Sequence, residues 1–158
     1  MRKQKGFSLI ELLIVVAIIL IIAAIAIPNL LRSRIAANEA SAVGSMRTIN
    51  TAEITYASTY PSVGYSPDLP SLAGAACTSP TSAGACLIDA TLGAATTVAG
   101  SKSGYVFTYA ADANVGYKLN GDAAHQGSTG IKHFYTDGTA VIHYNGSASS
   151  GAGDPAIQ

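Results

Sequence analysis

The chain opens with an apolar run that only a membrane or the core of a protein assembly can accommodate. The run extends from Phe7 to Leu31, its stretch from 12 to 27 is unbroken, and its single charge is Glu11. About 20 apolar residues suffice to span the hydrocarbon core of a bilayer. A carboxylate deep in a bilayer costs about 2.5–3.5 kcal/mol on insertion scales, so Glu11 requires a functional explanation and a partner.

Two common interpretations of the run leave Glu11 unexplained. A secretory signal peptide would have a basic start, an apolar stretch and an A-x-A cleavage site, here at Ala24 and Ala26. A plain membrane anchor would need only an apolar run long enough to span the bilayer, and this run is long enough. Neither segment gains anything from an acidic residue. A third interpretation is cleavage in front of the run, between Gly6 and Phe7, which leaves the run on the mature chain.

The residues from Gly6 to Pro28 read GFSLIELLIVVAIILIIAAIAIP and resemble the class III signal of type IV pilins and the related pseudopilins of type II secretion systems. The resemblance covers about the first 35 residues. In that family a membrane peptidase removes a short basic leader after a glycine, and the new N-terminal residue is N-methylated. The resemblance therefore implies a leader at 1–6, cleavage between Gly6 and Phe7, and methylation of Phe7.

The resemblance also supplies a partner for Glu11. The family's glutamate is the fifth residue of the mature chain, as Glu11 would be, and is thought to pair with the N-terminal amine of a neighbouring subunit. Glu11, Phe7 and Pro28 are thus assigned to subunit assembly. An ion pair in an apolar core penalises wrong register more than it adds stability. The implied partners are identical subunits, the inner membrane, a prepilin peptidase and methylase, and the pilus assembly machinery.

The charge balance argues against a nucleic-acid-binding surface. The chain has nine basic and nine acidic side chains. Loss of Arg2, Lys3 and Lys5 with the leader leaves six basic side chains and a net charge of about −3, whereas nucleic-acid-binding proteins show basic patches. The leader charges should stay cytoplasmic, which places the rest of the chain outside. The length of 158 residues suits one domain.

The segment 32–58 is predicted to continue the helix as an amphipathic half. Apolar residues recur at helical spacings, at Leu31, Ile35, Ala42, Met46, Ile49 and Tyr56. Polar residues are assigned to the other faces: Arg32, Asn38, Arg47 and Asn50. A helix from Phe7 to about Ser58 would be roughly 78 Å long at ~1.5 Å per residue, far longer than a bilayer is thick. Its outer half must therefore pack on another part of the protein.

The C-terminal part is predicted to form a four-stranded antiparallel sheet at 105–145. Alternating runs occupy Tyr105–Ala111, Val115–Leu119, Ile131–Tyr135 and Ala140–Tyr144. Asp137-Gly138 between the last two runs is a strong hairpin signal. Pilins are similar, with a sheet against the outer half of a long helix. The fold class is accordingly α+β, and the segment 146–158 is expected to be a flexible tail.

The segment 59–104 is rich in Ala, Gly, Ser, Thr and Pro and is predicted to be a long surface loop. It contains both cysteines, Cys77 and Cys86. In an exported domain two cysteines favour a disulfide, and the alternative is two free thiols. In many type IV pilins a disulfide encloses a C-terminal segment. This chain departs from that pattern, because both of its cysteines lie in the segment 59–104.

The sequence predicts no enzyme, cofactor or metal site. A two-residue turn at Asp137-Gly138 would pair His133 with Ile142 and direct His133 and His143 to opposite faces of the sheet. Asp122, Asp137 and Asp154 lack the spacing of a calcium loop and are interpreted as solvated turn residues.

The sequence thus predicts a pilin, the structural subunit of an extracellular type IV pilus, made as a single-pass inner-membrane precursor. Adhesion, twitching motility and DNA uptake are roles open to such a filament. Two alternatives remain: a pseudopilin of a type II secretion system, which would share every N-terminal feature, and a membrane-tethered binding protein with a ligand loop at 59–104.

Overall fold

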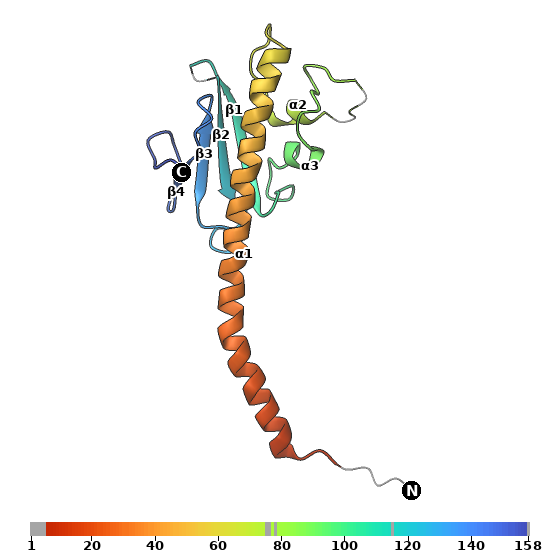
Figure 1. The fold of residues 1–158 in the computed structure, drawn as a ribbon, viewed down its shortest axis with the longest axis vertical. Coiled ribbons are helices and arrows are strands. Elements are labelled where there is room, and N and C mark those ends of the chain that lie inside the picture. The colour runs from red at the N-terminus through yellow and green to blue at the C-terminus, as the bar shows by residue number, and fades with distance from the viewer. Residues whose placement is uncertain (1–5, 75–76, 78, 115, 158) are drawn as a thin grey trace. The chain divides into compact units, whose positions relative to one another are not determined.

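The computed structural model describes residues 6–74, 77, 79–114 and 116–157 (Figure 1). Its elements, in chain order, are α1 (Leu9–Thr59), α2 (Leu69–Ala73), α3 (Ala90–Gly93), β1 (Tyr105–Asp112), β2 (Gly116–Ala123), β3 (His133–Asp137) and β4 (His143–Asn145). The chain divides into two compact units, Met1–Arg34 and Ile35–Gln158. The long helix and the antiparallel sheet confirm the α+β prediction.

The C-terminal half of α1 provides one wall of the core in the unit Ile35–Gln158. Ala42, Met46, Ile49 and Tyr56 have no exposed surface, which confirms this part of the predicted apolar stripe, whereas Leu31 is 51% exposed and Ile35 is half-buried. Asn50 is also buried, with 4% of its surface exposed, so its assignment to another face is wrong. Asn50 follows Met46 by four residues, and residues four apart on a helix share a face.

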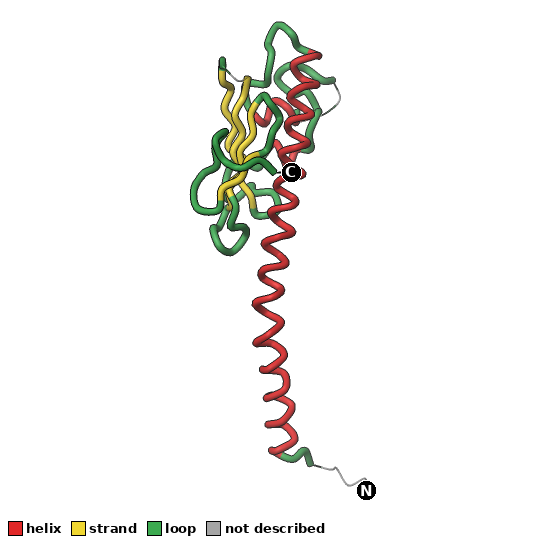
Figure 2. The backbone as a smooth tube through the Cα atoms, turned by 60° about the vertical axis from the view of Figure 1, so that its left-hand side comes forward, coloured by secondary structure: helices red, strands yellow, loops and turns green. Residues whose placement is uncertain are grey.

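The sheet packs its inner face on this half of α1 (Figure 2). The strand order is β1-β2-β3-β4, with every pair antiparallel. Gly121 of β2 pairs with Phe107 of β1 and Phe134 of β3. A Cβ at Gly121 would lie 3.2 Å from the Met46 sulfur and 3.3 Å from the Phe107 ring. The absent side chain at Gly121 therefore gives α1 and the neighbouring aromatic ring room to approach β2.

The register of the last hairpin differs from the prediction. Phe134 pairs with Tyr144 and Tyr135 with His143, and Asp137 belongs to β3. The Asp137 carboxylate accepts hydrogen bonds from the backbone N–H of Thr139, at 2.9 Å, and from its hydroxyl, at 2.7 Å. A longer connection with its own side-chain cap thus replaces the two-residue turn.

Both edges of the sheet carry additional backbone hydrogen bonds. At the β1 edge, Phe107 N–H donates to the Ala95 carbonyl at 2.7 Å. At the β4 edge, Tyr144 N–H donates to the Pro155 carbonyl at 3.0 Å, and Ile157 N–H donates to the Ile142 carbonyl at 2.8 Å. The C-terminal residues, expected to be a flexible tail, thus return along β4 because its outer edge offers them unpaired backbone groups.

Two short helices interrupt the segment expected to be a loop. The Asp68 carboxylate accepts from Ser71 N–H at 2.8 Å at the start of α2, and the Asp89 carboxylate accepts from Leu92 N–H at 2.9 Å at the start of α3. Each aspartate is an N-cap that satisfies a backbone donor of the first turn. Leu69, Leu72 and Leu92 are buried in the same core as the sheet.

Candidate functional site

The sequence motif begins just before α1. Gly6 and Phe7 precede the helix, and the Phe7 side chain is 75% exposed. Residues 1–5, which include the basic side chains of the expected leader, lie outside the described part of the chain. The bond between Gly6 and Phe7 thus lies in an exposed, non-helical stretch, as peptide-bond cleavage requires. Cleavage and methylation here stay predictions.

Glu11 has a local partner that the motif analysis missed. Its carboxylate accepts a hydrogen bond from the backbone N–H of Ser8 at 2.9 Å. Ser8 and Glu11 have the spacing of a capping box, in which an N3 glutamate satisfies the backbone donor of the N-cap residue. The S-x-x-E pattern was the sequence signal for this contact. The carboxylate therefore stabilises the start of its own helix in the single chain.

The apolar part of α1 is exposed on all sides in the single chain. Its large side chains between 9 and 31 keep 46% to 80% of their surface. Among the described residues, α1 is the one helix long and apolar enough to cross a membrane, by length and composition alone. A helix that is apolar all round requires burial in lipid or against other helices. Pro28 lies within this helix, which continues to Thr59; its assigned role in assembly stays a prediction.

A buried polar cluster connects α1 to the sheet. The side-chain amide oxygen of Asn50 accepts a hydrogen bond from the Tyr117 hydroxyl at 2.8 Å. The Asn50 amide donates to the Thr136 hydroxyl at 3.1 Å and to the Ala140 carbonyl at 3.2 Å. All three partners come from the sheet or its last connection. Asn50 therefore fixes the position of α1 on β2 and β3, since each of these buried groups would lose its partner if the helix shifted.

Glu53 is a second buried polar residue that the sequence analysis missed. It has no exposed surface, and its carboxylate accepts from the backbone N–H of Ser66 at 3.0 Å and from the Ser66 hydroxyl at 2.5 Å. The Tyr109 hydroxyl donates to the Ser66 carbonyl at 2.8 Å. Burial raises the pKa of Glu53 above its ordinary value of 4.5, although the hydrogen bonds from Ser66 and Tyr109 oppose that rise. The spacing of three residues to Tyr56 was the signal that Glu53 faces the core.

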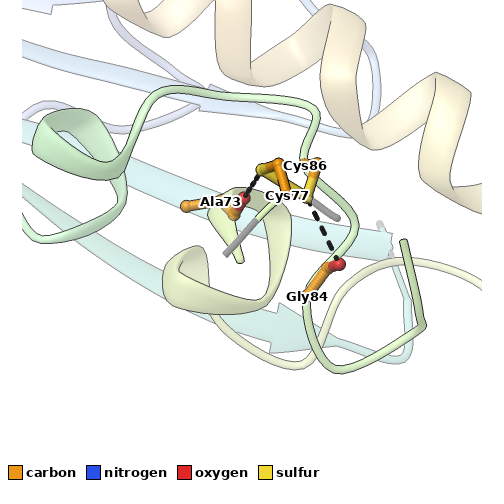
Figure 3. The surroundings of a disulfide bond; sticks show 4 residues. All are labelled: Ala73, Cys77, Gly84 and Cys86. Carbon is orange, nitrogen blue, oxygen red and sulfur yellow. Dashed lines mark hydrogen bonds between the residues drawn. A yellow bond between two sulfur atoms is a disulfide. The ribbon is translucent and has the colours of Figure 1, made fainter. Parts of the chain in front are cut away.

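The cysteines form the predicted disulfide (Figure 3). Their Cα atoms lie 5.5 Å apart, and the Cys77 sulfur lies 3.4 Å from the Ala73 carbonyl oxygen. The chain beside Cys86 is also held by its backbone, because Ala85 N–H donates to the Ser71 carbonyl at 2.8 Å. A ring of this size contributes about 2.5–3 kcal/mol on the chain-entropy estimate. The disulfide thus fastens this loop to the end of α2.

The histidines lie differently from the prediction. His133 pairs with Asn145 across the strands, so His133 and His143 share a face, and the prediction of opposite faces is wrong. The Nδ1 atom of His133 lies 2.7 Å from an Asp122 oxygen, and that of His143 lies 2.6 Å from the Asp154 carbonyl oxygen. Each ring is thus engaged with a separate partner. Within the described residues no group of three or more His, Cys, Asp or Glu side chains could hold a metal ion.

Comparisons with known proteins identify the N-terminal motif. The family model for the prokaryotic N-terminal methylation motif matches residues 1–27. The chain is 67% identical over 39 residues to the type IV wide pilus major component PilA4 of Thermus thermophilus, a match that covers 25% of this chain and 30% of that protein. It is 43% identical over 54 residues to the type IV major pilin protein PilA of Myxococcus xanthus, covering 34% of this chain and 24% of that protein.

These matches confirm the resemblance to type IV pilins in the N-terminal segment. The chain matches less than a third of the length of either relative. No solved structure matches the chain. The motif and the long apolar helix fit a membrane-anchored precursor.

Proposed function

We propose that the chain is the structural, non-enzymatic subunit of an extracellular type IV pilus. The proposal rests on one observation about α1. The first half of this helix is apolar on all sides, is exposed in the single chain, and carries one carboxylate near its start. A helical bundle of identical segments would bury that surface. The match to two proteins named as pilus components supports a pilin over a secretion pseudopilin.

The proposed pathway follows from the motif. The precursor inserts through residues 7–31, a membrane peptidase cleaves between Gly6 and Phe7, and Phe7 is methylated. The subunit then moves from lipid into the bundle, where Glu11 pairs with the Phe7 amine of a neighbour. Little hydrophobic free energy drives this transfer, because lipid tails are as apolar as partner helices. The assembly machinery must therefore supply the work.

Mass spectrometry of filaments sheared from the cell surface tests the proposal directly. The expected result is this chain with methylated Phe7 at its N-terminus. A mature chain beginning after Ala26 would restore the signal-peptide interpretation. Normal filaments together with blocked protein secretion after deletion of the gene would favour a pseudopilin. A chain that stays monomeric in mild detergent and never assembles would favour a membrane-tethered binding protein.

The leader glycine provides a second test. Replacement Gly6→Val should leave uncleaved precursor in the membrane, because a β-branched side chain should not fit where the peptidase accommodates a glycine. Immunoblots of membrane and filament fractions would measure precursor and mature chain. Full processing of Gly6→Val would show that Gly6 does not define the cleavage site.

A further inference from the structure

Asn145 and Gly146 form an Asn-Gly pair at the end of β4. An asparagine followed by glycine is chemically labile, because the backbone nitrogen of the glycine can attack the side-chain amide carbon of the asparagine with no Cβ in the way. The chain has a second Asn-Gly pair, Asn120-Gly121, inside β2. The structure places the two pairs in different surroundings, so their reactivities can be compared within one molecule.

The backbone nitrogen of Gly146 is available for this attack. Gly146 follows the last residue of β4, is exposed, and its N–H has no hydrogen-bond partner among the described residues. Gly121, by contrast, is buried and pairs with Phe107 on one side and Phe134 on the other. The hydrogen-bonded ladder on both sides of a central strand holds its backbone in place. The structure therefore protects Asn120 and leaves the other pair reactive.

Hydrogen bonds hold the Asn145 side chain over the peptide that contains the attacking nitrogen. Its amide oxygen accepts from the backbone N–H of Ser147 at 3.0 Å and from the Ser147 hydroxyl at 3.2 Å. A side chain that accepts from the N–H two residues later folds back over the peptide between them, which here contains the Gly146 nitrogen. The two donors also face the oxygen on which negative charge collects during the attack. Donors in that position lower the barrier to acyl transfer.

The amide nitrogen of Asn145 closes the loop 146–154. It donates to one oxygen of the Asp154 carboxylate at 3.1 Å. The other oxygen accepts from the Gly151 N–H at 2.8 Å and from the Ser150 hydroxyl at 3.2 Å. Exchange of the amide nitrogen for an oxygen would replace a donor by a second negative charge beside Asp154, and like charges so close repel each other. The closed loop thus depends on the amide at position 145.

We propose that Asn145 is a self-modification site, at which the pair Asn145-Gly146 converts to an aspartyl or isoaspartyl linkage and thereby opens the loop 146–154. The Gly146 nitrogen loses its proton to hydroxide and bonds to the side-chain carbon, while an electron pair of the C=O bond moves to Oδ1. That pair then returns, the bond to the amide nitrogen breaks, and the nitrogen takes a proton from water and leaves as ammonia, which regenerates hydroxide. One water molecule opens the resulting succinimide ring at either carbonyl.

Peptide mapping of the full chain in detergent, kept folded in mildly alkaline buffer, tests the reaction. Trypsin cleaves after Lys118 and Lys132, so Asn120 and Asn145 fall in different peptides, and mass spectrometry resolves the exchange of NH₂ for OH in each. Asn145 should convert several-fold faster than Asn120 in the folded chain. In denaturant, where the sheet no longer protects it, Asn120 should become reactive as well. Equal rates in the folded chain, or no conversion at Asn145, would overturn the inference.

Variants of the two following residues test the geometry. Gly146 has no positive φ, and a Cβ there would have no neighbouring atom within 4 Å. Gly146→Ala should therefore leave the fold intact and suppress most of the conversion, because the methyl group hinders the attack. Ser147→Ala removes one donor to the Asn145 oxygen and should slow conversion several-fold. Ser149→Ala, an exposed residue of the same loop, is the matched control and should leave the rate unchanged. Unchanged conversion in Gly146→Ala or Ser147→Ala would contradict the mechanism.

Hydrogen exchange tests the consequence for the loop 146–154. The Gly151 N–H, which donates to Asp154, should exchange slowly in the fresh wild type. Asn145→Asp reproduces the charge of the product and should speed this exchange, and an aged wild-type sample should approach the same pattern. An aged sample that has converted at Asn145 but exchanges like a fresh one would show that the loop stays closed. None of these outcomes depends on filament formation, because every group involved lies in the unit Ile35–Gln158.

Discussion

Glu11 has one role seen in the single chain and one proposed for the filament, and the substitution Glu11→Val removes both. In the single chain its carboxylate caps the start of α1 through Ser8 N–H, and in the proposed filament it pairs with the Phe7 amine of a neighbour. Glu11→Val should insert into the membrane at least as well as the wild type, because insertion no longer buries a charge. Filaments should nevertheless be absent, since an unpaired amine in an apolar bundle costs several kcal/mol per subunit. Electron microscopy and membrane immunoblots would measure both outcomes.

Glu11→Gln separates the two roles of this residue. Glutamine can satisfy the N-cap backbone donor as glutamate does, but it cannot neutralise an amine. The expected result is loss of filaments with an intact helix start. Wild-type numbers of filaments on cells that make only Glu11→Gln would show that capping, not ion pairing, explains the carboxylate.

Glu53 should make the stability of the outer domain depend on pH. Its pKa in the folded chain is raised above the ordinary value of 4.5 by burial. A raised pKa means that the folded state holds the proton more tightly, so the contribution to stability is complete below about 4.5 and is lost as pH rises through the folded pKa. Relative to Glu53→Gln, the wild type should therefore become more stable as pH falls from 7 toward 5.

Urea unfolding of the detergent-solubilised chain, followed by circular dichroism, measures the free energy of unfolding of both chains across this pH range. Their difference isolates Glu53 from groups that act in the opposite direction. Asp137 is one of these: burial alone would raise its pKa, but hydrogen bonds from Thr139 and Tyr135 and the nearby His143 together lower the pKa below its ordinary value. A difference that does not change with pH would show that Glu53 is ionised throughout.

At the scale of elements, local patterns were sufficient to predict α1 and the positions of the four strands. The stripe of Met46, Ile49 and Tyr56 repeats with the helical period, and Phe107, Tyr109 and their neighbours alternate as a strand requires. These periods follow from backbone geometry alone. Asn50 was assigned to the wrong face and Glu53 was missed, because a polar residue cannot be placed in an apolar stripe until its buried partner is known.

The remaining features depend on contacts that a sequence pattern does not contain. The last hairpin is longer than predicted because the Asp137 side chain caps its own turn. The helices α2 and α3 have five and four residues. Each is little more than one turn long, so no helical repeat of apolar residues can be seen in the sequence. Their N-caps, Asp68 and Asp89, were the available sequence signal. A groove beside α1 is lined by Val43 of α1, Phe134 of β3, Tyr144 of β4 and Ile157, and no local pattern could predict a site built from such distant segments.

The contact between α2 and α3 depends on Gly93. A Cβ at Gly93 would lie 2.5 Å from the Ala73 Cβ, so Gly93→Ala should destabilise the domain by about 1–3 kcal/mol through overpacking. Ala73→Gly in the same chain removes the opposing methyl group and should recover part of the loss. A double-mutant cycle by urea unfolding measures this coupling.

Gly44→Ala is the matched control for this cycle. Gly44 lies exposed in α1, and a Cβ at this position would have no neighbouring atom within 4 Å, so alanine should stabilise the helix by about 0.5–1 kcal/mol. The double variant would contradict the contact between the two helices if its free energy of unfolding showed no recovery. The effects of Gly93→Ala and Ala73→Gly would then be independent.

At the scale of the whole molecule, the two units have different requirements for folding. The buried apolar core of the described residues lies between Ala42 and Ile142, within the unit Ile35–Gln158. The apolar half of α1 contributes no described side chain to it. A fragment from 35 to 158 should therefore fold as a soluble domain when its disulfide is allowed to form.

Circular dichroism and size-exclusion chromatography of this fragment check the prediction. Its unfolding midpoint should lie within a few degrees of the midpoint of the same domain in the full chain, because no core contact is removed. A fragment that is unfolded at room temperature, or that aggregates despite an intact disulfide, would show that the outer domain depends on the apolar segment.

The hydrogen bonds at both edges of the sheet have a consequence for how subunits can join. Exposed strand edges allow sheets to extend from one molecule to the next and lead to cross-β fibres, which are extremely hard to dissolve. Here Phe107 is bonded to Ala95 at one edge, and Tyr144 to Pro155 at the other. In the filament proposed above, subunits would therefore join through side-chain contacts and the apolar helix, and such a filament could be taken apart and its subunits used again.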